Sequence, residues 1–184
     1  MDNGAENYRR FLEGDEKGIE AIITEYKDGL ILFLNSYVRN LDIAEELAED
    51  TFVRLFLKKP KNRGGASFKT WLYTIGRNIA TDYLRKLSRR KEEPLEEHYD
   101  IADEENLEKN YIRQEQKIVL HKAMNKLKPE YRNVLWLTYF EGMSNKETAE
   151  ITGKKTHSVE MTLTRARAAL KAELEKEGFV YEVE

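Results

Sequence analysis

The sequence predicts an all-α protein of two helical domains joined by an acidic linker, with a helix-turn-helix as the C-terminal domain. Three observations support this fold class. Apolar residues from Val159 to Leu174 recur at helical spacing, Ser144 and Glu147 form a helix-capping pattern, and acidic and basic residues are segregated along the 184-residue chain. The expected units are an N-terminal domain over 1–91, a linker over 92–116 and a C-terminal domain over 117–184.

The second half of the N-terminal domain is strongly basic. Between Arg54 and Lys91 the chain has twelve Lys or Arg residues and one acid, Asp82, although its formal net charge is −3. A basic stripe of this kind neutralises the phosphates of a nucleic acid, whatever the charge of the rest of the chain. We therefore expect this domain to bind nucleic acid.

Aromatic residues are interleaved with these basic residues, and two interpretations stay open. Phe68, Trp71 and Tyr73 lie among lysines and arginines, as in proteins that stack unpaired bases. Trp71 and Ile75 also fit an apolar helix face, which would make the aromatic residues part of the core. The glycines at 64–65 give the preceding loop freedom to admit a ligand, or they form a simple turn.

Residues 92–116 are expected to divide the two domains. They carry ten acids against two basic residues, include Pro94 and have few large apolar side chains before Tyr111. Such a composition buries too little apolar surface to fold by itself. We expect the first half of this segment to be a solvated linker.

The helix-turn-helix is predicted from its boundaries. Pro129 fits the first position of a helix, where no amide hydrogen is needed. Ser144 and Glu147 form a capping box at the start of the next helix. Gly142 and Gly153 fit the left-handed position that ends a helix. The third helix then has a buried stripe at steps of three and four, namely Val159, Leu163, Ala166, Leu170 and Leu174.

The opposite face of that third helix would meet DNA. It mixes guanidinium groups with side chains short enough to approach base edges. Its members are Glu160, Met161, Thr164, Arg165, Arg167 and Lys171. On spacing alone, an ordinary three-helix bundle with exposed charges is the alternative.

Composition argues against an enzyme or a membrane protein. The chain has no cysteine, and its histidines at 98, 121 and 157 lack metal-ligand spacing. No glycine-rich phosphate loop is present. No apolar run approaches the ~20 residues of a membrane span, and the N-terminus lacks the features of a secretory signal. We expect a cytoplasmic protein that is not membrane-inserted, has no metal or cofactor and is not an enzyme.

Two parts of the sequence resemble the sigma-70 family of bacterial RNA polymerase sigma factors. The residues similar to its N-terminal domain are Asp42–Phe52, Phe68–Tyr73, Arg77-Asn78 and Asp82–Arg85. Those similar to its promoter-reading C-terminal domain are Leu127–Arg132, Phe140–Ser144, Glu147, Ala149–Ile151 and Arg165–Leu170. Both parts occur in the family's order in a short chain, so the resemblance is to the extracytoplasmic-function (ECF) group and covers about Ile19 to Leu174.

The resemblance implies a non-catalytic subunit that recognises −35 and −10 promoter elements and helps to open the duplex. The implied partners are core RNA polymerase, promoter DNA and an anti-sigma factor. The residues expected at the polymerase are Leu47, Asp50 and Phe52. Those expected at the −10 element are Asn62, Arg63, Ser67, Phe68, Arg77, Asn78, Arg85, Lys86 and Arg89. Those expected at the −35 element are Lys154, Lys155, Ser158, Glu160, Met161, Thr164, Arg165 and Arg167.

The recognition helix departs from the family pattern. Glu160, Met161 and Thr162 stand where family members usually have a basic residue, a small polar residue and an arginine, and Thr74 replaces a usual basic residue. We therefore predict an unusual −35 preference. The alternative function is a stand-alone helix-turn-helix regulator, which would leave the segment 42–56 unexplained.

Overall fold

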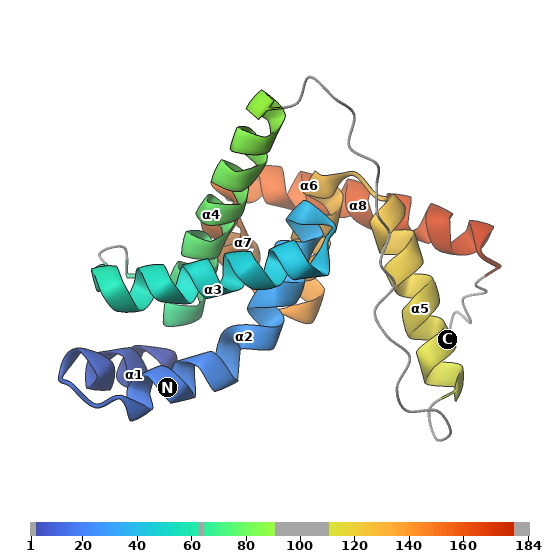
Figure 1. Cartoon of the computed structure of the whole chain (residues 1–184). Helices are drawn as coiled ribbons and strands as arrows, with labels where there is room; N and C mark the ends of the chain where they lie inside the picture. The colour runs from blue at the N-terminus through green and yellow to red at the C-terminus, as the bar shows by residue number, and fades with distance from the viewer. Residues whose placement is uncertain (1–2, 63–64, 91–110, 179–184) are drawn as a thin grey trace.

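The computed structural model describes residues 3–62, 65–90 and 111–178, and the side chains at 90 and 111–118 are left out of the description. Within these residues the regular secondary structure is entirely helical (Figure 1). The predicted all-α class is confirmed. So is its division into two helical domains with a C-terminal helix-turn-helix.

Four helices make the N-terminal domain: α1 (Asn3–Leu12), α2 (Lys17–Val38), α3 (Leu41–Lys58) and α4 (Phe68–Arg90). Helix α2 is the centre of the domain and contacts the other three. It is apolar on several faces, and its Leu30, Phe33 and Leu34 are fully buried. Asn40 begins α3 by accepting a hydrogen bond from the Ile43 amide at 3.0 Å, as expected of an N-cap.

The C-terminal domain consists of α5 (Tyr111–Lys126), α6 (Pro129–Leu135), a short π-helix (Trp136–Phe140), α7 (Asn145–Thr152) and α8 (Thr156–Lys176). Helix α5 begins at Tyr111, so the end of the segment expected as a linker, 111–116, is helical. The reason is visible in the sequence, because the acidic run thins after residue 108 and Tyr111 and Ile112 restore apolar residues. Residues 92–110 lie outside the described residues.

The predicted helix boundaries of the helix-turn-helix are confirmed. Pro129 is at the first turn of α6, and Ser144 and Glu147 form a complete capping box on α7. Gly142 and Gly153 have φ of +65° and +68°, which a residue with a side chain rarely adopts. In the predicted stripe of α8, Val159, Leu163, Ala166 and Leu174 are buried and Leu170 is half-buried.

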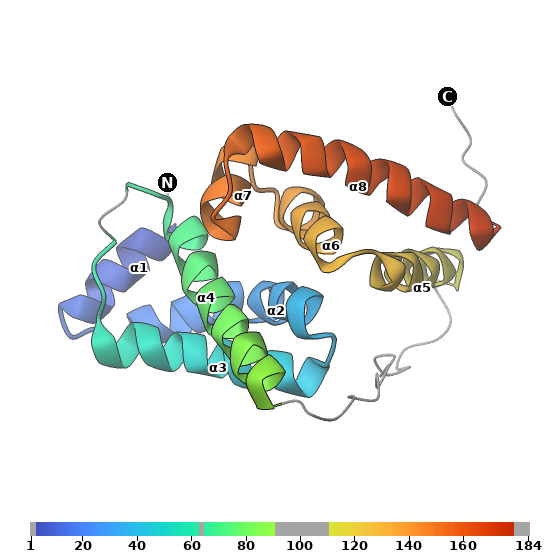
Figure 2. The same cartoon turned by 90° about the horizontal axis from the view of Figure 1, so that it is seen from above.

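The two domains pack directly against each other. Helix α7 lies along α4, and α6 with the π-helix lies against α2 (Figure 2). At the α2–α6 contact, the buried Arg132 donates from Nε to the Ser36 carbonyl at 2.7 Å, and the Ser36 hydroxyl lies 2.9 Å from Asn133 Oδ1. The sequence predicted two domains separated by a linker and no contact of this kind.

Candidate nucleic-acid and polymerase interfaces

The exposed face of α8 carries the residues predicted for the −35 element. All eight of them are exposed, two in the turn before the helix and six along it. Met161 is the apolar member of this face and is 45% exposed. Thr162 is different, because it is 8% exposed and its hydroxyl lies 3.4 Å from Glu130 Oε1. Of the three departures from the family pattern within α8, only Glu160 and Met161 therefore lie on this face.

Two of the predicted −35 cations already have partners within the C-terminal domain. Lys154 forms an ion pair with Glu130, and this hydrogen bond holds the pKa of the Glu130 carboxyl below its usual value. Arg167 donates from Nε to the Tyr139 hydroxyl at 2.5 Å, and its guanidinium lies 5.7 Å from the centre of the Tyr139 ring. Both side chains are therefore held by partners on the surface of their own domain.

The residues predicted for the −10 element are divided between solvent and the domain contact. Asn62, Asn78, Arg85, Lys86 and Arg89 are exposed, and Arg63 lies outside the described residues. The half-buried ones are Ser67 and Arg77. Arg77 donates to the Thr152 carbonyl at the end of α7 at 3.1 Å, and Ser67 Oγ lies 3.5 Å from Glu147 Oε1.

Phe68 is not available for stacking on a base. Its ring is 2% exposed and lies among Tyr8, Tyr26 and Trp71 at centroid distances of 5.5 to 5.8 Å. Tyr73 is also buried, at 1% exposed. Of the two open interpretations of these aromatic residues, the structure supports the core for both. The prediction of Phe68 as a DNA contact was wrong because an aromatic residue among lysines fits a buried face as well as a basic surface.

Glu141 joins the two domains through a nearly buried carboxylate. Its side chain is 9% exposed, and Oε2 lies 2.9 Å from Lys69 Nζ and accepts a hydrogen bond from the Tyr73 hydroxyl at 2.8 Å. Trp136 Nε1 donates to Oε1 at 3.3 Å, and Lys69 also bonds the Glu141 carbonyl at 2.9 Å. Burial raises the pKa of Tyr73, so its hydroxyl stays a donor. A buried charge needs such a set of partners, and here they come from both domains.

A second contact between the domains uses the capping box of α7. The Glu147 carboxylate accepts from the Ser144 amide at 2.9 Å and also lies 3.2 Å from the Thr70 hydroxyl of α4. These hydrogen bonds, led by that of the Ser144 amide, hold the pKa of Glu147 below its ordinary value. A residue predicted only as a helix cap therefore also contacts α4, on the side where −10 residues were expected.

The α3–α4 surface differs from the prediction for polymerase binding. Phe52 and Leu47 are 6% and 5% exposed, so both belong to the core, whereas Asp50 is exposed. A groove of about 350 Å³ lies between α3 and α4, and Leu47 and Asp50 line it together with Val53 and Leu57. Phe52 was expected at the polymerase, but helical spacing places it on the buried face of α3.

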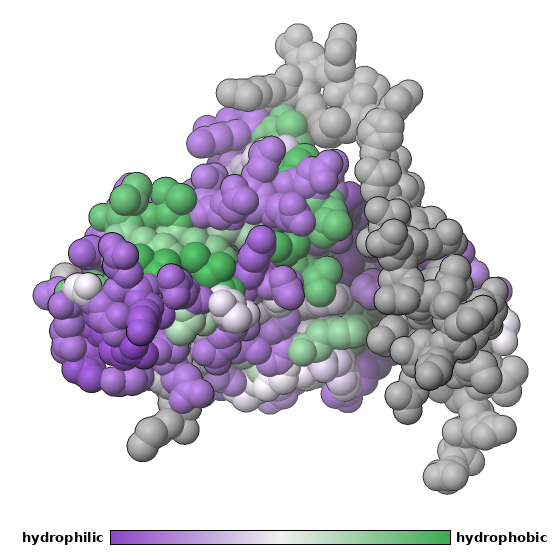
Figure 3. Space-filling view, turned by 60° about the horizontal axis from the view of Figure 1, so that its bottom comes forward, coloured by the Kyte–Doolittle hydropathy of each residue, from purple (hydrophilic) through white to green (hydrophobic). Residues whose placement is uncertain are grey.

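Val53 and Leu57 were missed by the sequence analysis, although they are the most exposed apolar residues of this surface. Leu57 is 80% exposed and Val53 is 51% exposed. Apolar side chains form a band along α3 in the space-filling view of this face (Figure 3). The signal was present in the sequence, because Asp50, Val53 and Leu57 follow one another at steps of three and four and so share a helix face.

Both halves of the chain match models of one family. Residues 22–90 match the model for sigma-70 region 2, and residues 117–170 match that for sigma-70 region 4. The chain is 31% identical over 166 residues to the RNA polymerase sigma factor YlaC of Bacillus subtilis, covering 86% of this chain and 92% of that protein. This chain belongs to the sigma-70 family of RNA polymerase sigma factors. It is also 26% identical to the ECF RNA polymerase sigma-E factor of Haemophilus influenzae, over 90% of this chain and 92% of that one.

The sigma factor is also similar to solved structures. A structure of the sigma factor RpoE in complex with the anti-sigma factor NepR from Bartonella quintana superposes with a TM-score of 0.72 and 25% identity, over 86% of this chain and 98% of that chain. CnrH in complex with the cytosolic domain of CnrY shares the fold, with a TM-score of 0.64 and 24% identity over 95% of this chain and 96% of that one. The first superposition spans both domains of the sigma factor.

The described part of the sigma factor has neither a membrane-spanning helix nor a cluster of metal ligands. None of its described helices combines the length and the apolar character of a membrane span. Among the same residues, no three His, Cys, Asp or Glu side chains gather as metal ligands would.

Proposed function

We propose that this sigma factor uses three surfaces to start transcription at specific promoters. The α3–α4 groove binds core RNA polymerase, the exposed part of α4 with the preceding loop holds the −10 strand, and α8 reads the −35 element. The unit over 1–91 carries the first two surfaces and the C-terminal unit carries the third, with the linker, expected over 92–116, ending where α5 begins at Tyr111. The observation that carries the proposal is that each domain presents its own exposed polar surface, while a largely apolar groove between α3 and α4 adjoins that of α4 and shares Lys86 with it. Its proposed location is the cytoplasm, and it acts without catalysis of its own.

The −35 contact rests on the exposed face of α8. Arg165 and Arg167 supply phosphate affinity or base contacts, and Lys154 and Lys155 add charge beside the helix. Glu160 is also exposed, and its carboxylate would accept from a cytosine amino group while it repels nearby phosphate. Replacing it by arginine should therefore change the base preference. Comparing Glu160→Arg with the parent chain on randomised promoters tests this, and identical preferences would contradict the proposed role.

The −10 contact rests on α4 and the loop before it. Asn78 is exposed and its amide both donates and accepts, as reading a base edge requires. Arg85, Lys86 and Arg89 lie further along the same helix and would hold phosphates. Extruding a base costs a few kcal/mol, which stacking, pocket contacts and phosphate pairing can offset. Recognition and strand opening would then be coupled.

The proposal includes a separation of the two domains, which are packed together in the structure; this packed state is called the closed arrangement. Arg77 and Ser67 face α7, so they reach DNA only when the C-terminal domain leaves α4. RpoE, which superposes on both domains, was solved with an anti-sigma factor. We propose that an anti-sigma factor partner binds this chain and holds it closed, and that core polymerase stabilises the open form.

Polymerase binding is the first point to test, by comigration with bacterial core RNA polymerase at about 0.15 M salt, where long-range charge attraction is largely screened. Leu57→Asp places a charge on the exposed groove without touching the core and should abolish comigration. Leu12→Asp is the matched control, because Leu12 is 47% exposed on α1 and does not line the groove. Equal binding by both variants would remove the groove from the proposal, and failure of the parent chain to bind would reject polymerase binding altogether.

A further inference from the structure

Helix α1 contacts both ends of the connection between α3 and α4, whose described residues are 59–62 and 65–67. Tyr8 donates from its hydroxyl to the Pro60 carbonyl at 2.9 Å, across 52 residues of sequence. Pro60 is the second residue after α3. At the other end, Phe68 begins α4, and its ring lies 5.7 Å from that of Tyr8. The matched family segment begins at residue 22, so α1 lies outside it.

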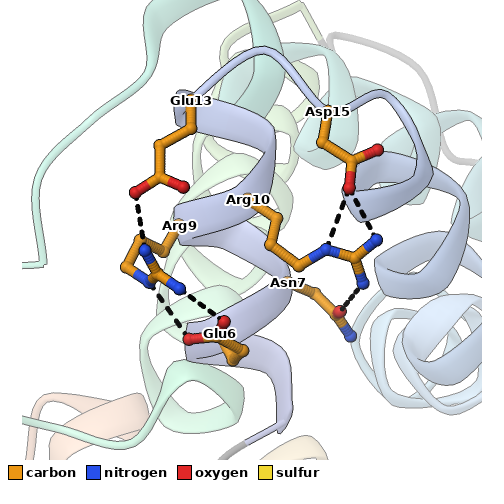
Figure 4. Close-up of polar contacts among 6 residues, drawn as sticks. All are labelled: Glu6, Asn7, Arg9, Arg10, Glu13 and Asp15. Carbon is orange, nitrogen blue, oxygen red and sulfur yellow. Dashed lines mark hydrogen bonds and ion pairs between the residues drawn. The ribbon is translucent and has the colours of Figure 1, made fainter.

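The packing of α1 leaves little room for displacement. Tyr8 is 7% exposed, and its ring also lies 5.3 Å from Trp71. A Cβ atom on Gly4 would lie 2.4 Å from the Phe68 ring, so the helix approaches α4 at backbone distance. Ion pairs of Arg9 with Glu6 and Glu13 lie on the outer face of α1 (Figure 4). These exposed pairs add little stability, so the position of α1 depends on its buried face.

Contacts of Lys59 and Asn62 also hold the described part of the connection. Lys59 Nζ lies 4.9 Å from the centre of the Phe11 ring, which adds a second α1 contact at the start of the connection. Within the connection, Asn62 Nδ2 donates to the Ala66 carbonyl at 2.8 Å, while Asn62 itself stays exposed. The hydrogen bond of Tyr8 therefore fixes the backbone two residues before an exposed amide side chain.

We propose that Tyr8 is a positioning residue for −10 recognition: its hydroxyl fixes the backbone at Pro60, and thereby the place from which Asn62 and Ser67 meet the unpaired strand. This rests on the proposed −10 contact. The ring of Tyr8 packs in the core, whereas its hydroxyl bonds the connection at Pro60. The packing role and the positioning role can therefore be tested separately. A site held to within a fraction of an ångström loses selectivity when its support is removed.

The test is Tyr8→Phe, which keeps the ring and removes the hydrogen bond. With core polymerase at saturation, opening is measured by permanganate reactivity on promoters carrying each base at each −10 position. We expect opening to fall about fivefold on the preferred promoter, the size of one lost hydrogen bond, and discrimination at the positions nearest the connection to weaken. Affinity for core polymerase and for the −35 element should stay the same. Tyr131→Phe, which removes a hydroxyl from α6 in the other domain, is the control.

The outcomes separate this inference from the function on which it rests. If the parent chain itself shows no −10 preference, the proposed −10 contact fails and the inference with it. If the parent discriminates and Tyr8→Phe keeps the same profile, the inference alone is overturned. A uniform loss at every position, together with weaker −35 binding, would also overturn it, because a purely structural role has that signature.

Discussion

The two DNA-facing helices of this sigma factor are presented very differently. On α8, every residue predicted for the −35 element is exposed, and the contacts of Lys154 and Arg167 stay within their own domain. On α4, Arg77 bonds the end of α7, and the adjoining Lys69 and Tyr73 bond Glu141. The predicted −35 residues of α8 are open to solvent. The predicted −10 residues of α4 are partly covered by the C-terminal domain, which also carries α8. Under the proposed function, separation of the domains would uncover the −10 surface and leave the −35 surface unchanged.

We expect the largest effect from reversing the charge of Glu141, which should separate the domains and so expose the covered part of α4. Glu141→Lys would place two cations where one ion pair now joins the domains. We expect it to destabilise the closed arrangement by about 2–3 kcal/mol, a discounted value because Lys69 is one-third exposed. Small-angle X-ray scattering should then show a larger radius of gyration than for the parent chain. Glu175→Lys, an exposed reversal on α8, is the control, and equal radii for both variants would contradict the role of Glu141.

The second prediction compares arginines of the two surfaces in duplex DNA binding by the chain alone. Arg165→Ala should weaken binding to a −35 duplex about tenfold and reduce the salt slope by about one, because one phosphate or base contact is lost. Arg77→Ala should have no effect in the same assay, since its guanidinium faces Thr152. Fluorescence anisotropy at several salt concentrations measures both. A loss with Arg77→Ala equal to that with Arg165→Ala would show that α4 already meets DNA in the closed chain.

The third prediction concerns the start of α7, the helix that covers α4. Ser144→Ala removes the hydroxyl that accepts from the Glu147 amide at 3.2 Å, and such a change typically costs about 1 kcal/mol. We expect a lower free energy of unfolding in urea, followed by circular dichroism. Ser88→Ala, on the exposed end of α4, should leave the midpoint nearly unchanged. A smaller loss for Ser144→Ala than for Ser88→Ala would contradict the importance of the cap.

The smallest expected effect is a pH dependence of the α4–α7 contact. The pKa of Glu147 is lowered in the folded protein, so its carboxylate stabilises the fold fully above the ordinary value of 4.5. That stabilisation is lost as the pH falls from about 4.5 through the lowered pKa. Thermal unfolding between pH 6 and 3 should show the decline. Glu147→Gln keeps a capping side chain and should remove the share of this pH dependence that the Glu147 carboxylate contributes. An unchanged pH profile would argue against that contribution.

Local patterns in the sequence predicted the C-terminal domain well. The stripe from Val159 to Leu174 and the Ser144 cap depend on neighbours within a few residues, so spacing alone places them. Phe52 and Phe68 were expected at binding surfaces but are buried in the core. The reason is that the same spacing fits both a core face and a binding face. The domain contact of Glu141 was not predicted, for a different reason. Its partners Lys69 and Tyr73 are 72 and 68 residues away in the chain, and no local pattern reports such a contact.

Three hydrogen bonds between the two domains join a side-chain donor to a main-chain acceptor, so substitution of the donor and of the acceptor residue has different effects. Arg77, Lys69 and Arg132 donate from side chains, but their acceptors include the main-chain carbonyls of Thr152, Glu141 and Ser36. A carbonyl oxygen is present whatever residue stands there. Substitution at Thr152 therefore leaves its acceptor intact, whereas substitution of Arg77 removes the bond. Saturation mutagenesis should record these three hydrogen bonds on the donor side alone, whereas the bonds to the Glu141 carboxylate depend on both residues, so covariation between paired positions would miss part of the domain contact.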